Sequence, residues 1–230
     1  MEHLIGHGKM VLAAMIAMIL SGLFFIVMTD LVSAGKVDHY DHRVIGYLRH
    51  HRRPGVVEDI ATDISGLGGP GGWLLVTGMV GGLYLVRGRY QITARLFGTI
   101  SSGAVVTIFL KGMIDRVPPG QPDYLPAINY YPSFPSGHAM MATIAYLTIG
   151  LTLARLVRDR RTKIYVVAMS AGLVFLIGVT RVYLCIHWPT DVLAGWAAGL
   201  TWALLCWIVV TRIRQIRDQR KMKLQLQAIA

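Results

Sequence analysis

Six apolar segments, each about as long as a bilayer-spanning helix, constrain this chain more than any other feature of its sequence. A transmembrane helix needs roughly 20 mostly apolar residues. The 230 residues are 54% hydrophobic with a mean hydropathy of +0.51, which is too apolar for an ordinary soluble domain. The segments lie at 10–31, 72–87, 93–110, 137–157, 164–185 and 192–211. The sequence therefore predicts an all-α integral membrane protein with six transmembrane helices in one membrane-embedded domain, residues 1–230.

The first apolar segment could be a cleavable signal peptide, because small residues follow it at 32–35. Its apolar part is longer than the roughly 7–15 residues of a signal-peptide core, so we expect an uncleaved signal anchor. Residues 32–71, between the first two spans, mix acidic and basic residues with apolar ones at helical spacing. They predict short amphipathic helices along the membrane surface.

Lysine and arginine are concentrated in alternate loops of the predicted topology. Clusters at 87–95 and 155–163 follow the second and fourth spans, and residues 212–230 form a basic tail. By the positive-inside rule both termini are cytoplasmic, and segment 32–71 lies outside despite its five basic residues. Topology thus accounts for much of the net charge of +11. We expect no nucleic-acid partner, because no aromatic platform accompanies these charges.

Several aromatic residues near the predicted span ends suggest an interfacial belt, in which amphipathic rings lie at headgroup level. They are Trp73, Tyr124, Tyr130, Tyr131 and Trp188.

Three polar clusters lie beside the apolar segments. One runs from Lys111 to Pro119 after the third span, the second is residues 135–138 before the fourth, and the third is residues 180–191 between the last two. Counting spans from a cytoplasmic start places all three on the outer face. Each residue alone could be a snorkelling cation or a helix cap. Together on one face, ionisable groups beside hydrocarbon indicate a functional site.

The first part of the expected chemistry is anion binding. Lys111 and Arg181 supply cations, and guanidinium matches phosphate oxygens in bidentate geometry. Ser136 is a natural N-cap before an apolar helix, and Gly137 lets backbone N–H groups approach a ligand. Helix N-termini bind phosphate, so an anionic ligand is predicted.

The second part is acid–base and nucleophilic chemistry. His138 and His187 supply two imidazoles, of which one can attack and the other can give a proton. Asp191, four residues after His187, can accept its ring N–H and orient it. Zinc would accept these three ligands, but the neighbouring cations favour an anion instead.

These residues resemble the type 2 phosphatidic acid phosphatase family, the membrane lipid phosphatases related to vanadium haloperoxidases. The resemblance rests on Pro135-Ser136-Gly137-His138 with Arg181, His187 and Asp191. It implies that His187 forms a phosphohistidine, Asp191 supports it and His138 protonates the leaving oxygen. Lys111, Ser136, Gly137 and Arg181 would hold the phosphate oxygens, and no metal or cofactor would be needed.

The first family motif departs from its usual pattern. The family has a lysine, six residues, then Arg-Pro, whereas Pro118-Pro119 follows Lys111 at that distance. Arg116 lies two residues earlier, where the family often has an arginine as well. Arg116 could reach the phosphate, the substrate could need one cation fewer, or activity could be impaired. Thr180 stands where the family usually has serine and keeps the hydroxyl.

The resemblance implies a metal-independent phosphatase of membrane lipids whose site faces outward, which would be the periplasm if the membrane is a bacterial inner membrane. Undecaprenyl diphosphate and phosphatidylglycerol phosphate are the favoured substrates, with phosphatidate and lipid A phosphates as further candidates. Two alternatives remain: a lipid phosphotransferase with the same intermediate, and a catalytically silent lipid-phosphate binder or transporter.

Overall fold

The computed structural model describes residues 2–52, 55–119 and 132–227, without the side chains of residues 2–7, 221–223 and 226. Within these ranges every regular element is an α-helix, which confirms the predicted fold class. The helices are α1 (Glu2–Ser33), α2 (Asp38–His51), α3 (Val56–Leu67), α4 (Pro70–Val86), α5 (Tyr90–Lys111), α6 (Gly137–Ala154), α7 (Arg160–Tyr183) and α8 (Pro189–Gln227).

Five of these helices, α1, α5, α6, α7 and α8, are each long and apolar enough to cross a membrane. The predicted second span is α4, which has only 17 residues. Helix α4 meets the criteria of length and apolar character only when it is taken together with α3. The α3–α4 pair is bent by 55° at the break between the two helices. Counting this pair as one broken span gives the predicted six. The amphipathic helices expected within residues 32–71 are α2 and α3.

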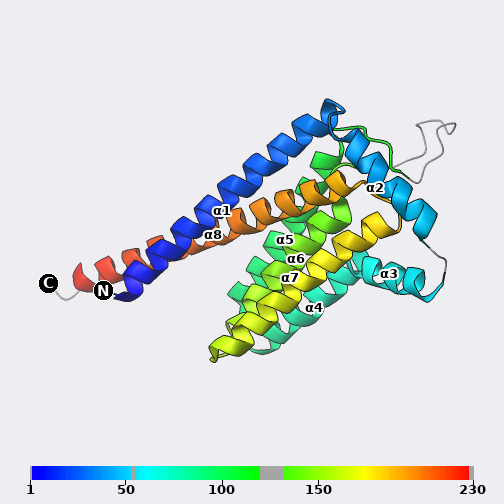
Figure 1. Cartoon of the computed structure of the whole chain (residues 1–230). Coiled ribbons are helices and arrows are strands. Elements are labelled where there is room, and N and C mark those ends of the chain that lie inside the picture. The colour runs from blue at the N-terminus through cyan, green and yellow to red at the C-terminus, as the bar shows by residue number, and fades with distance from the viewer. Residues whose placement is uncertain (1, 53–54, 120–131, 228–230) are drawn as a thin grey trace.

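Helix α6 lies at the centre of the bundle and packs against α5, α7 and α8, while α1 runs alongside α8 (Figure 1). In α6, 61% of the residues are buried inside the protein, against 11% in the apolar part of α1. The outward side chains of α1 are mostly large and apolar, as a helix in contact with lipid requires. Trp73 packs against the apolar core, and Tyr124, Tyr130 and Tyr131 lie outside the described residues.

Two glycines on α8 let it approach α6 closely. A Cβ on Gly195 would lie 2.7 Å from the Ser136 carbonyl oxygen, and one on Gly199 would lie 2.6 Å from that of Met140. Small residues four apart permit this contact, which is common between membrane helices. Asp191 lies one turn before Gly195, so the face that packs on α6 also carries Asp191 to the start of α6.

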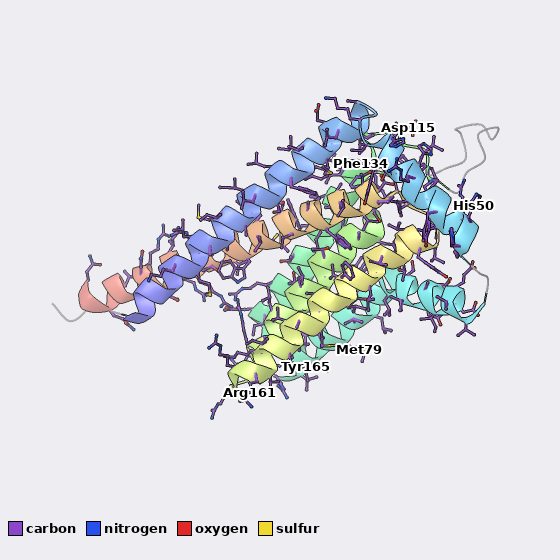
Figure 2. The ribbon with its side chains drawn as sticks, in the orientation of Figure 1. His50, Met79, Asp115, Phe134, Arg161 and Tyr165 are labelled. Carbon is purple, nitrogen blue, oxygen red and sulfur yellow. The ribbon has the colours of Figure 1, made fainter. Side chains whose placement is uncertain are left out.

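The polar residues singled out from the sequence collect at one end of the bundle. The ends of α5 and α7 and the starts of α6 and α8 lie there, together with α2 (Figure 1). Figure 2 shows Asp115 and Phe134 at this end and Arg161 and Tyr165 at the opposite end. Phe134, which directly precedes Pro135-Ser136-Gly137-His138, is buried and stacks on Phe25 of α1 at a ring separation of 6.2 Å.

We expect Gly195→Ala to lower the thermal unfolding temperature in detergent by several degrees. The added methyl would meet backbone atoms of α6, and overpacking of this kind costs about 1–3 kcal/mol. Gly172→Ala on α7 is the matched control, because nothing lies within 4 Å of its added Cβ. Equal unfolding temperatures for the two variants would contradict the close α6–α8 contact.

Candidate active site

The start of α6 forms the floor of the candidate site. Ser136 is the N-cap residue, and its Oγ accepts a hydrogen bond from the Ala139 N–H at 3.4 Å. Its own N–H donates to the carbonyl oxygen of Asp191 at 3.0 Å, which joins the starts of α6 and α8. The free N–H groups of the first turn carry partial positive charge, so this helix start suits an anion.

Lys111, the last residue of α5, reaches across the start of α6. A Cβ on Gly137 would lie 3.0 Å from Lys111 Cε, so the absence of a side chain at Gly137 makes room for the lysine. Lys111 Nζ donates to the carbonyl oxygen of Pro132 at 2.7 Å, which holds the ammonium group near the helix start.

A Schellman motif ends α7 and places His187. The Ile186 N–H donates to the Arg181 carbonyl at 3.1 Å and the Cys185 N–H to the Val182 carbonyl at 2.9 Å. Cys185 occupies the left-handed position with φ 54°, where most motifs have glycine, at a cost of about 1–2 kcal/mol. The His187 N–H also donates to the Arg181 carbonyl, at 3.2 Å. The backbone of His187 is therefore fixed against the end of α7.

His187 is only 6% exposed, and its Nδ1 faces a carboxylate. The distance from Nδ1 to Asp191 Oδ2 is 3.5 Å, at the outer limit of a hydrogen bond and without its alignment. Burial lowers the pKa of His187, Asp191 opposes this shift, and Arg181 and Lys111 add to it. The ring is therefore neutral at neutral pH, which is the form of an imidazole that can attack phosphorus.

The Asp191 carboxylate is fully buried and accepts hydrogen bonds from two donors. Arg116 Nη1 donates to Oδ1 at 2.7 Å, and the Trp188 N–H donates to Oδ2 at 3.0 Å. A buried carboxylate is tolerated only when it is paired and hydrogen-bonded, and these contacts meet that requirement.

Arg116 is the centre of an ion network that extends to α2. Its Nη2 donates to Asp41 Oδ2 at 2.7 Å and to Asp38 Oδ1 at 3.2 Å, and its Nη1 donates to Thr190 Oγ1 at 2.8 Å. Burial alone would lower the pKa of Arg116, but Asp191 and Asp41 outweigh it and raise the pKa above its usual value. The guanidinium is thus committed to carboxylates.

Sequence reasoning missed Asp41, which is fully buried in α2 and also accepts the Thr190 N–H at 3.2 Å. Asp38 and Asp41 lie three residues apart in the first turn of α2, where acidic residues are common for the helix dipole alone. Their role depends on α2 packing over the start of α8, which no local pattern reveals.

Arg181 and His138 complete the site from the remaining helices. Arg181 Nη1 donates to Ser65 Oγ of α3 at 2.8 Å, while its buried Nε has no hydrogen-bond partner in the part of the chain that the structure describes. The positive charges of Arg181 and Lys111 act on the His138 ring, and His187 lies close enough to interact with it electrostatically. These four side chains therefore converge on one site.

The bend between α3 and α4 packs directly on His138. A Cβ on Gly68 would lie 3.3 Å from His138 Cβ and 2.5 Å from Ile177 Cγ2, and one on Gly69 would lie 3.4 Å from His138 Nε2. The glycine pair thus lets backbone contact the imidazole, and the broken span forms one wall of the site.

All the predicted site residues lie at this end of the bundle. Lys111, Gly137, His138, Arg181 and His187 surround the start of α6, and Ser136 joins it to Asp191. Arg116 differs, because it contacts Asp191 from the side of α2. Pro118 stands at the family arginine position, and Arg49 of α2 donates to the carbonyl of the next residue, Pro119. Within the described ranges, no group of three or more His, Cys, Asp or Glu residues is arranged to hold a metal ion.

A buried imidazole backed by a carboxylate, a second imidazole and two cations at a helix start are the groups that phosphoryl transfer in a membrane protein would require. The family model of the PAP2 superfamily matches residues 91–215, more than half of the chain, and the chain belongs to this superfamily. The predicted family is thereby confirmed, and with it the enzyme class, a hydrolase of lipid phosphates.

Characterised relatives cover most of the chain. Phosphatidylglycerophosphatase B of Bacillus subtilis is 29% identical over 77% of this chain and 87% of its own length. Lipid A 1-phosphatase of Rhizobium etli is 29% identical over 70% of this chain and 74% of its own length. The crystal structure of a PAP2-type phosphatidylglycerolphosphate phosphatase from Bacillus subtilis superposes with a TM-score of 0.76 at 26% identity, covering 85% of this chain and 96% of that one.

We expect Gly68→Ala to lower kcat at least about tenfold, because the added methyl would displace Ile177 or His138, and misplacing a reacting group by about 1 Å can cost a hundredfold. Gly66→Ala, two residues earlier in α3, is the control, since nothing lies within 4 Å of its added Cβ. Initial rates of phosphate release from a lipid phosphate in detergent measure both. Wild-type kcat in Gly68→Ala would show that the bend does not position His138.

Proposed function

We propose that this protein hydrolyses the phosphate of a membrane lipid through a phosphohistidine on His187, without a metal ion. The observation that carries this proposal is the buried His187–Asp191 pair, with a distance of 3.5 Å between Nδ1 and Oδ2, beside the cations of Lys111 and Arg181. A neutral imidazole oriented by a carboxylate and facing cations is equipped to attack a phosphoryl group.

In the first step His187 Nε2 attacks phosphorus, because Nδ1 faces Asp191. A nitrogen–phosphorus bond forms, and the bond from phosphorus to the lipid oxygen breaks. His138 gives a proton to that leaving oxygen. Lys111, Arg181 and the N–H groups at the start of α6 hold the remaining phosphate oxygens as negative charge develops on them.

In the second step water attacks the phosphohistidine from the side that the lipid has left. His138, now without its proton, accepts one from the water. The phosphorus–oxygen bond forms, the nitrogen–phosphorus bond breaks, and inorganic phosphate leaves with both imidazoles restored. A lipid diphosphate follows the same route, with a lipid monophosphate as the first leaving group.

Asp191 and Arg116 act behind the nucleophile. Asp191 holds the His187 ring and stabilises the positive charge that the ring gains during attack. Arg116 supports Asp191, because its short contacts are with carboxylates and a threonine hydroxyl. These contacts favour the account in which the phosphate is held with one cation fewer than usual, and they make Arg116 a positioning residue.

Phosphatidylglycerol phosphate is the first candidate substrate and undecaprenyl diphosphate the second. The Bacillus subtilis relatives, named for phosphatidylglycerophosphate, support this order by sequence and by fold. The distribution of basic residues supports cytoplasmic termini and a site on the outer face of the membrane. In a bacterium this would be the periplasmic face of the inner membrane.

We expect purified wild-type protein to release phosphate from a panel of lipid phosphates in detergent, and His187→Ala to be slower by about a thousandfold or more. Activity should persist in chelator and be inhibited by vanadate, which imitates five-coordinate phosphorus. His50→Ala, in α2, controls for removal of an imidazole elsewhere.

Three outcomes contradict the proposal in different ways. Normal turnover by His187→Ala removes the phosphohistidine. Labelled phosphate that appears on an added alcohol rather than as free phosphate indicates a phosphotransferase. Saturable lipid binding without turnover across the panel indicates a silent binder.

We expect Arg116→Gln to lower kcat by roughly tenfold to a hundredfold while the inhibition constant of vanadate changes less than about threefold. Loss of the guanidinium leaves Asp191 and Asp41 as neighbouring buried carboxylates, and breaking such a network costs about 3–5 kcal/mol. Adding Asp41→Asn removes one of these charges and should restore part of kcat. Thermal unfolding identifies variants that fail to fold. If Arg116→Gln fails to fold, Arg116→Lys, which keeps the positive charge, replaces it in these measurements.

A phosphate-binding role for Arg116 predicts a different pattern. Vanadate affinity and KM would then weaken together in Arg116→Gln, and Asp41→Asn would not restore activity.

A further inference from the structure

A cavity at the other end of the bundle lies far from the candidate active site. Its volume is about 790 Å³, and it is lined by the start of α5, the ends of α4 and α6, residues 200–218 of α8 and Met10 of α1. The active site lies at the opposite ends of α5 and α6. Sixteen residues of α5 separate Arg95, in the cavity wall, from Lys111, which is about 24 Å along a helix.

Cationic side chains dominate the polar part of this cavity. Five arginines line it, namely Arg87, Arg89, Arg95, Arg155 and Arg214, and the only acidic lining residue is Asp218. Within the described ranges none of the five forms an ion pair. Arg87, Arg89 and Arg155 line the cavity together with Tyr84, whose hydroxyl donates to the carbonyl oxygen of Thr152 at 2.9 Å.

Arg95 is the most informative of these arginines. Its Nη2 donates to Gln91 Oε1 at 3.3 Å, but its Nη1 is buried and has no hydrogen-bond partner among the described residues. A buried guanidinium nitrogen without a partner is costly, and an anionic group in the cavity would remove that cost.

The remaining walls of the cavity are apolar. Leu96, Leu147, Leu151, Leu204 and Val210 contribute aliphatic side chains, and Trp207 contributes its ring. The volume is within the range of pockets that bind small organic ligands, about 300–1,000 Å³. A cationic mouth with an apolar interior, open at the end of a membrane-spanning bundle, matches one class of ligand, an acidic amphiphile.

We propose that this cavity, the arginine cavity, binds an acidic phospholipid from the leaflet opposite the active site. The headgroup phosphate contacts Arg95 and the arginines around Tyr84, and part of an acyl chain lies between α5 and α8. The proposal is independent of the chemistry at His187. The proposal assigns the arginines of this cavity a specific ligand, in addition to the general attraction of basic residues to anionic membrane surfaces.

The test uses purified His187→Ala protein, so that lipid binding is measured without turnover. Phosphatidylglycerol and phosphatidylcholine with identical acyl chains are titrated in detergent, and bound lipid is counted by native mass spectrometry. We expect saturable binding of phosphatidylglycerol at least about tenfold tighter than that of phosphatidylcholine, because basic residues attract an anionic headgroup.

Two variants locate the site. Arg95→Gln combined with Arg155→Gln should reduce the preference for phosphatidylglycerol to less than about threefold, whereas Arg160→Gln combined with Arg161→Gln, outside the cavity at the start of α7, should leave it unchanged. Ala203→Trp places an indole ring inside the cavity and keeps every arginine, so it should weaken saturable binding at least about tenfold. Phosphatase activity of Ala203→Trp with an intact His187 shows that this variant folds.

Equal affinities for the two lipids in the parent protein would overturn the proposal. Unchanged binding by Ala203→Trp would also do so, because attraction to the basic surface would then be sufficient. Displacement of the lipid by millimolar inorganic phosphate would mean that the cavity recognises a free anion instead of a lipid.

Discussion

The organisation of the active end depends on one buried charge, the carboxylate of Asp191. It is fully buried, and it receives hydrogen bonds from Arg116 and from the backbone of Trp188. The backbone of the same residue accepts the N–H of Ser136, so the starts of α6 and α8 meet at Asp191. An unpaired carboxylate could not remain here. The Asp191 carboxylate can therefore face His187 only when three segments pack together. These segments are helix α2, the loop that carries Arg116 and the turn before α8.

The spans and most site residues could be predicted from the sequence, because hydrocarbon imposes a strict length on helices and makes every polar residue beside them conspicuous. The network around Arg116 could not. Asp41 and Asp38 lie in a segment of mixed charge, where acidic residues need no special reason, and Ser65 of α3 is an ordinary polar residue on an amphipathic helix. Their contacts with Arg116 and Arg181 arise from the packing of α2 and α3, which has no local signal. Likewise, the contact of Gly68 and Gly69 with His138 could not be predicted, because it depends on the bend between α3 and α4.

Pro118 in place of the family arginine has a different meaning in this context. Arg116 is bound to carboxylates, so it is not free to take over the missing contact with phosphate. The neighbouring carbonyl of Pro119 is instead contacted by Arg49 of α2. In the proposed mechanism Lys111, Arg181 and backbone donors therefore hold the anion, and Arg116 supports the carboxylate behind the nucleophile. One arginine, Arg181, would thus bind the phosphate, and the other, Arg116, would position the nucleophile through Asp191. Two arginines that both contacted the phosphate would not divide the two roles in this way.

The break between α3 and α4 also bears on the depth in the membrane at which the proposed reaction would take place. Helix α4, with 17 residues, is about 26 Å long, close to the thickness of the hydrocarbon layer, so a bilayer that α4 spans would have its headgroup boundary near the first residue of α4. The carbonyl of Leu67, exposed by the break, accepts the hydroxyl of Tyr146 on α6 at 2.6 Å, which ties this boundary to the central helix. His138 contacts the same bend. A bilayer spanned by α4 would therefore have its headgroups at the level of this imidazole, where a lipid phosphate can be reached without lifting its chains out of the bilayer.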